Sequence, residues 1–213
     1  MVPTLNNLLA RSAELERRLE GFILPPPFDE PDKLVASRIM CSIAFEHAES
    51  VKVLIGAGNF TSATGLLRLQ FEAFVRGMWL IYVADADSVA LLMSELSDEG
   101  MVKAQKMPTP AAMLDELEGK ALKQTLAKLK EFKQNSWKSL NSFVHGGIHA
   151  VNRHSKGYPI LLLMQLLKAS NSLSVMVCML MSELAESPIG KNRVAEINIE
   201  FEDCLPMDSK TER

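Results

Sequence analysis

Apolar residues recur at the spacing of an α-helix along nearly the whole chain, and proline or glycine residues divide this pattern into segments. The first segment covers about 2–24 and ends at Pro25, Pro26 and Pro27, because proline removes a backbone donor and blocks helix continuation. Further helices are expected over about 32–56, 60–84, 85–107, 111–134, 136–154 and 160–186. The pattern therefore predicts an all-α bundle of about seven helices.

The C-terminal tail departs from this helical pattern. Ala195, Ile197, Ile199 and Phe201 alternate with polar or acidic residues, a period of two that is typical of a half-buried strand. No second strand is expected in the chain. We therefore expect this strand to pair with a two-fold mate, which predicts a homodimer. A tail that folds back onto its own helices is the alternative.

The length of 213 residues suits one domain with a large core. No linker divides the chain, so we expect a single helical domain over 1–213. Its parts are an N-terminal helix and proline-rich turn (1–30), a helical core (31–187), and the C-terminal strand and tail (188–213).

Composition limits the classes of partner and location. The net charge of −3 gives no overall attraction to phosphate or anionic lipid. The three cysteines are isolated, as in a reducing compartment, and the N-terminus lacks a signal-peptide pattern. The apolar run 160–181 is interrupted by Gln165, Lys168 and Asn171, whereas a membrane span needs about 20 apolar residues. We expect a buried helix there, a cytoplasmic protein and no membrane partner.

A narrow charged strip crosses the otherwise apolar helix expected at 60–84. Arg68, Glu72 and Arg76 lie at positions i, i+4 and i+8, so they share one face. The helix at 32–56 carries a similar strip of four residues, Arg38, Ser42, Glu46 and Glu49. Charges on interior helices must be paired because burying a lone charge is costly. A self-neutralising surface triplet is the alternative interpretation of Arg68, Glu72 and Arg76.

Three of the four histidines lie within residues 145–154, on the helix expected at 136–154. Its predicted core stripe is Trp137, Leu140, Val144, Ile148 and Val151. Beside that stripe, at the edge between core and water, lie Asn141, His145, His149 and Asn152. If this edge faces the charged strips, the domain holds a pocket with arginines, carboxylates and imidazoles. Alternatively, the histidines only form hydrogen bonds with a neighbouring loop.

Two kinds of chemistry suit such a pocket. In phosphoryl transfer on RNA, a histidine acts as general acid or base and arginines neutralise charge on phosphorus, without metal or cofactor. In metal binding, His145 and His149 would act with Glu46, Glu49 or Glu72. The Glu-x-x-His pairs of a di-iron bundle are absent, so we expect no metal. Nucleophilic triads and phosphate-binding glycine loops are also absent from the sequence.

The stretch Leu67–Leu80 (LRLQFEAFVRGMWL), followed by Ser142–Gly147 (SFVHGG), resembles a group of bacterial all-helical proteins related to the HEPN superfamily and the abortive-infection proteins. The resemblance implies a HEPN-like bundle. Many HEPN proteins are metal-independent ribonucleases of toxin, phage-defence and RNA-processing systems. They are usually homodimers whose active site spans the interface.

Carried over residue by residue, the resemblance implies His145 as the catalytic histidine, with Arg68, Glu72 and Arg76 as its charged partners. The neighbours expected to bind the substrate are Asn141, Ser142, His149, Asn152 and Arg153. The family's catalytic signature is Arg followed by four to six residues and then His. The residues four to six places before His145 and His149 are not arginine, so the chain departs from this signature. The hypotheses are thus an endoribonuclease of a toxin–antitoxin or defence system, or a non-catalytic helical protein that binds RNA, an antitoxin or another protein.

Overall fold

The computed structural model describes residues 4–23 and 29–206, and all regular structure in these ranges is helical. Ten α-helices and two short 3-10 helices follow one another. They are α1 (Leu5–Leu19), η1 (Glu20–Phe22), α2 (Asp32–Gly56), α3 (Phe60–Tyr82), α4 (Ala86–Met93), α5 (Asp98–Ala104), α6 (Pro110–Glu116), α7 (Lys123–Val144), α8 (Ile148–Lys156), α9 (Ile160–Leu184), α10 (Pro188–Glu200) and η2 (Glu202–Cys204). The all-α prediction is confirmed.

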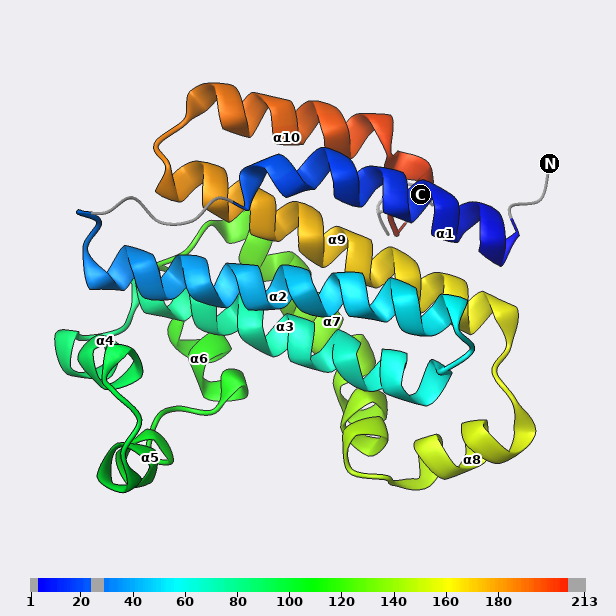
Figure 1. The fold of residues 1–213 in the computed structure, drawn as a ribbon, viewed down its shortest axis with the longest axis horizontal. Helices are drawn as coiled ribbons and strands as arrows, with labels where there is room; N and C mark the ends of the chain where they lie inside the picture. Colours follow the sequence, from blue (N-terminus) through cyan, green and yellow to red (C-terminus); the bar gives the residue numbers. More distant parts are fainter. Residues whose placement is uncertain (1–3, 24–28, 207–213) are drawn as a thin grey trace.

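The centre of the bundle consists of α2, α3 and α9, which pack against one another (Figure 1). A short turn with Gly58 at φ 80° joins α2 to α3 and lets them run antiparallel. Apolar side chains surround all three helices, so each must be covered on several sides. Phe71 and Phe74 of α3 and Leu167 of α9 are almost fully buried in the resulting core.

Two groups of helices cover this centre from opposite sides (Figure 1). On one side α1 and α10 pack on α9. On the other side α6, α7 and α8 pack on α3, and α4 packs on α2. Figure 1 shows α4 and α5 at one end of the long axis and α8 at the other.

A buried polar network joins α3 to α9 inside the core. Gln70 is fully buried, and its amide nitrogen donates to the backbone oxygen of Ser170 at 3.0 Å and to the hydroxyl of Ser174 at 3.3 Å. The hydroxyl of Ser170 donates back to Gln70 Oε1 at 2.7 Å. Every polar atom of the Gln70 amide is therefore satisfied, which fixes the register between the two helices.

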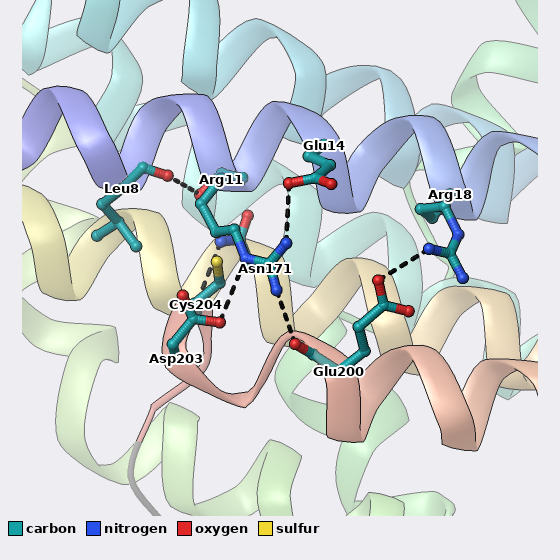
Figure 2. A network of polar contacts seen from close by, with 9 residues as sticks. Leu8, Arg11, Glu14, Arg18, Asn171, Glu200, Asp203 and Cys204 are labelled. Carbon is teal, nitrogen blue, oxygen red and sulfur yellow. Dashed lines mark hydrogen bonds and ion pairs between the residues drawn. The ribbon is translucent and has the colours of Figure 1, made fainter.

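A second network joins α1 and η2 to α9 (Figure 2). The amide of Asn171 donates to the hydroxyl of Ser12 on α1 and to the backbone oxygen of Cys204 in η2. Arg11 donates to the backbone oxygen of Glu200 and stacks 3.9 Å from the centre of the Phe201 ring. Residues about 190 positions apart in sequence thus share one polar cluster.

The ten α-helices exceed the predicted seven because 85–107 forms two helices, 111–154 forms three instead of two, and the tail forms α10. The segment 85–107 divides into α4 and α5, since Ser97 caps α5 by accepting from the backbone N–H of Gly100. The segment 111–134 divides into α6 and the start of α7, because Gly119 adopts φ 73° and ends the first helix.

The predicted C-terminal strand is wrong. Residues 188–200 form α10, whose buried residues are Val194 and Ile197, followed by buried Phe201. These three positions follow helical spacing, whereas Ile199 is 70% exposed. The tail folds back onto its own helices through α9, and the strand-based argument for a homodimer is removed.

Within the described residues, α9 is the one helix long and apolar enough to cross a membrane, with a mean hydropathy of 1.6 over its best window. Half of that window is buried inside the bundle, and α1, α2, α3 and α10 all pack on α9. A buried core helix meets the same criteria of length and composition. Its position in this fold is that of a core helix.

Candidate functional site

Arg68 makes three side-chain contacts within the predicted site. Its Nε donates to Glu72 Oε1 at 2.7 Å, and its Nη1 donates to the side-chain oxygen of Asn141. The guanidinium also lies 4.1 Å from the centre of the Trp137 ring. Because Glu72 is on α3 while Asn141 and Trp137 are on α7, this contact joins the two helices. The structure therefore brings together three polar residues predicted separately and one aromatic residue.

Arg76 follows Glu72 by one turn of α3 but does not share its carboxylate. In the described residues Arg76 forms no ion pair, and its buried Nε has no hydrogen-bond partner. The self-neutralising triplet is thus asymmetric: Glu72 pairs with Arg68, and Arg76 keeps an unneutralised charge.

The polar strip of α2 does not join this cluster. Arg38 is buried, and its Nε donates to both carboxylate oxygens of Glu30 at 2.9 and 2.7 Å. Ser42, Glu46 and Glu49 are exposed and have no hydrogen bond or ion pair to the Arg68 cluster. The polar strips of α3 and α7 therefore meet, and the strip of α2 lies elsewhere.

His145 lies at the C-terminal end of α7, where its backbone N–H donates to the carbonyl of Asn141 at 3.2 Å. Its imidazole is exposed and forms no hydrogen bond within the described residues. Because His145 follows Asn141 by one helical turn, the two side chains share a face. His145 is thus a neighbour of the Arg68 cluster through Asn141, without direct contact with Arg68.

The single histidine helix expected at 136–154 is wrong: it is two helices. Gly146 adopts φ 62°, which ends α7. Gly147 donates from its backbone to the carbonyl of Ser142 at 2.7 Å, and the hydroxyl of Ser142 accepts from the backbone N–H of His149 at 3.0 Å. The motif Ser142–Gly147 therefore builds the turn, and Ser142 has a structural role that the sequence analysis missed.

This break also corrects the predicted core stripe. Leu140 is buried, but Ile148 is 79% exposed and Val151 is 63% exposed. The predicted stripe assumed one continuous helix, but the chain changes direction between α7 and α8, so residues of the two helices do not share one face. The one buried residue of α8 is Ala150.

On α8, His149 and Asn152 are exposed and Arg153 is partly exposed. The ring of His149 lies 6.5 Å from that of Phe143. These residues share the exposed end of the bundle with His145, but they make no contact with the Arg68 cluster. The predicted site residues thus form two adjacent groups, one on the α3–α7 seam and one on α8.

His154, absent from the predicted site, fixes α8 to α3. Its Nδ1 lies 3.3 Å from the hydroxyl of Thr61, which also contacts the hydroxyl of Tyr158 at 2.9 Å. Tyr158 packs against the rings of Phe60 and Phe143. No sequence signal pairs positions 61 and 154, because their contact depends on how α8 turns.

Acidic residues are absent from the two segments that form this end of the molecule. Residues 132–182 contain no Asp or Glu, and neither do residues 50–71. At the end of α7 and on α8 the cations are Lys138, Arg153 and Lys156, with His145, His149 and His154 beside them. We call the exposed surface of the end of α7 with α8 the acid-free face. It is electropositive although the whole chain carries −3.

The described residues contain no group of three or more His, Cys, Asp or Glu side chains that could hold a metal ion. His145 and His149, the proposed metal pair, fall on different helices and gain no third ligand. A hollow of about 810 Å³ lies instead between α4 and α5. None of the predicted site residues lines that hollow.

The comparisons with known proteins identify one family. A family model described as Family of unknown function (DUF6988) matches residues 41–207, which run from within α2 to beyond η2 and include both groups of site residues. The match gives no link to the HEPN or abortive-infection proteins. Neither the search of curated proteins nor that of solved structures found a match. Since the match covers well over half of the chain, the protein belongs to the DUF6988 family.

Proposed function

We propose that this protein binds RNA through the acid-free face, as a HEPN-like helical protein of a bacterial toxin or defence system in the cytoplasm. The observation that carries this proposal is the absence of any acid in residues 50–71 and 132–182, next to exposed His145, His149 and Lys156. Cations without neighbouring carboxylates attract phosphate and release counterions on binding. The HEPN relationship rests on the two motifs, Leu67–Leu80 and Ser142–Gly147.

The exposed side chains of this face have different roles in RNA recognition. Arg153 and Lys156 supply positive charge for the phosphate backbone. His149 beside Phe143 offers a ring face on which an unpaired base can stack. Asn152 is exposed next to them and can form hydrogen bonds with a base edge.

Cleavage is the stronger form of the same proposal. His145 would act as general base on a ribose 2′-hydroxyl, without metal, so that the 2′-oxygen attacks phosphorus and the 5′-oxygen leaves. The exposed, unbonded imidazole of His145 supports this role. Arg68 supports it only as a positioning residue, because Glu72, Asn141 and Trp137 already occupy its guanidinium.

The test combines binding and cleavage on one substrate. Labelled single-stranded RNA is titrated with protein in EDTA, and its length is then checked on a gel. Arg153→Ala with Lys156→Ala should weaken binding and reduce the magnitude of the slope of log affinity against log salt by about 1.4, since each of two lost phosphate contacts contributes about 0.7. The matched control, Lys103→Ala with Lys106→Ala on the opposite end, should leave both unchanged.

His145→Ala separates the two forms. If RNA is cleaved by the wild type and bound but not cleaved by His145→Ala, the ribonuclease form stands. If the wild type binds RNA and leaves it intact, the protein is a binding module. Salt-independent or absent binding would refute both.

A second candidate is a non-catalytic interaction or regulatory protein, for which an antitoxin or another protein is the partner. The observation in its favour is that Arg68 acts as a structural link between α3 and α7, with its Nε and Nη1 bonded to Glu72 and Asn141. Overproduction in bacteria distinguishes the candidates. Growth arrest relieved by His145→Ala supports the toxin, and harmless high-level expression supports the interaction protein.

A further inference from the structure

The helix α5 buries none of its residues within the described chain. Its Met101 and Val102 are more than half exposed, and Leu96 in the preceding loop is 97% exposed. A helix of seven residues is far too short to be stable by itself, and packing normally supplies the missing stability. The apolar side of α5, with Leu96, is therefore an unpartnered face beside the hollow between α4 and α5.

A second unpartnered face lies at the other end of the long axis (Figure 1). There α8 buries only Ala150, while Ile148 and Val151 stand in solvent, together with Ile160 and Leu161 at the start of α9. Large exposed apolar groups that cluster on one end of a molecule indicate a docking surface.

The charges around the two faces are complementary. Residues 85–106 carry five acids against two lysines: Asp85, Asp87, Glu95, Asp98 and Glu99 against Lys103 and Lys106. Residues 138–161 carry Lys138, Arg153 and Lys156 and no acid. Each face thus has exposed apolar residues, and the excess of acids at one face is opposite in sign to the cations of the other, the arrangement expected of matching interfaces.

We propose that the α8 face of one copy of this chain docks on the α4–α5 face of a second copy. Both faces lie on the side of the bundle away from α1 and α10, at opposite ends of its long axis (Figure 1). A two-fold axis between two copies therefore pairs each α8 with the α4–α5 of its partner. The two identical contacts close the assembly as a dimer, the commonest symmetry of soluble oligomers.

Ile148 and Val151 of one copy enter the hollow between α4 and α5 of the other. Its lining includes Leu91, Leu96 and Met107 among acidic and small polar residues, together with Lys103 and Lys106. Arg153 and Lys156 meet Glu95 and Glu99 at the rim of this contact. The contact covers α8, so a second copy and RNA compete for the same surface.

Charge reversal at each face tests the proposal by light scattering at up to about 100 µM protein. The wild type should have the mass of two chains. Glu95→Lys with Glu99→Lys, and separately Arg153→Glu with Lys156→Glu, should each weaken association at least about tenfold and give one-chain masses. The control, Glu196→Lys with Glu202→Lys on exposed positions of α10 and η2, should remain a dimer.

Mixing the two reversed variants provides the decisive measurement. Each reversed face then meets a face of opposite charge, so the mixture should recover the two-chain mass. Leu96→Asp, a change at a fully solvated loop position, should give monomers while retaining the wild-type circular dichroism and melting temperature. A monomeric wild type, a dimer that persists in both reversed variants, a mixture that stays monomeric, or masses above two chains would overturn the proposal.

The proposed dimer and the proposed RNA binding can be refuted separately. The Glu95→Lys with Glu99→Lys variant keeps the whole acid-free face, so it should bind RNA at least as tightly as the wild type while being monomeric. If that variant is monomeric and no protein binds RNA, the dimer stands and the proposed function falls. If RNA binds and the wild type is monomeric, the reverse holds.

Discussion

The guanidinium of Arg68 lies 4.1 Å from the centre of the Trp137 ring and donates at the same time to Glu72 and Asn141. One side chain thereby connects the middle of α3 to the last turns of α7. The position of the end of α7, and hence of His145, depends on this contact.

Replacing Arg68 by lysine should therefore destabilise the protein although the charge is kept. Lysine lacks the planar group that stacks on Trp137 while bonding two acceptors. We expect a loss of about 1–2 kcal/mol, measured by urea denaturation. Arg17→Lys, at an exposed position of α1, is the control and should change nothing. Equal stability of both variants would show that the contact contributes no more than a surface charge.

The buried ion pair between α1 and α2 should make stability depend on pH. Lys52 Nζ lies 3.0 Å from Glu16 Oε1, and this buried oxygen has no other polar partner within the described residues. Burial raises the pKa of Glu16 above its ordinary value of 4.5, against the smaller opposing effect of Lys52. The folded protein thus holds a proton that the unfolded chain has released. Stability should fall as pH rises from about 4.5 through the pKa of folded Glu16.

This part of the pH dependence should be absent in Glu16→Gln, whose side chain does not titrate. The measurement is the unfolding free energy from pH 4 to 7 in wild type and variant, with Glu196→Gln as the control for an exposed carboxylate. A difference between wild type and Glu16→Gln that stays constant over this range would contradict the assignment.

Removing one partner of the same pair should cost more than removing both. Glu16→Leu leaves Lys52 charged and buried, and we expect a loss of about 3–5 kcal/mol. Adding Lys52→Met should restore most of that loss, because two apolar side chains of similar size avoid the desolvation of two charges. A double-mutant cycle by chemical denaturation gives both values. Additive losses would mean that the residues do not interact.

Helical and strand-like descriptions of the tail predict different effects at neighbouring positions. In α10, Ile197 is buried and Ile199 is exposed. Ile197→Ala should therefore lower the unfolding free energy by about 2–5 kcal/mol, and Ile199→Ala should change it by less than about 0.5 kcal/mol. Similar losses at both positions would favour the strand.

The break at Gly146 makes a comparable prediction for the former histidine helix. Leu140→Ala, in the buried half, should cost about 2–5 kcal/mol. Ile148→Asn, on the exposed face of α8, should cost less than about 0.5 kcal/mol in the monomer. Thermal or urea unfolding of the monomeric Glu95→Lys with Glu99→Lys background measures both without interference from self-association. A large loss of unfolding free energy in Ile148→Asn would show that this face of α8 is part of the core.

The sequence by itself determined the fold class and most of the long helices. Helical periodicity and proline or glycine breaks placed α2, α3 and α9 within a few residues, because a helix that is apolar on all sides has one stable environment, the interior. The spacing of Arg68, Glu72 and Arg76 also predicted a shared face correctly. Such properties are local and can be read along the chain.

Only the tertiary structure decided where the chain turns and which faces meet. The turn at Gly146 depends on one glycine in the left-handed region and on the bonds from Ser142, neither of which alters the hydrophobic pattern. Phe201 and Ile197 fit a period of two as well as a helix, and burial against α9 selected the helix. The link from Arg68 to Trp137 and Asn141 joins residues about 70 positions apart. Such contacts depend on packing between elements, which local spacing cannot specify.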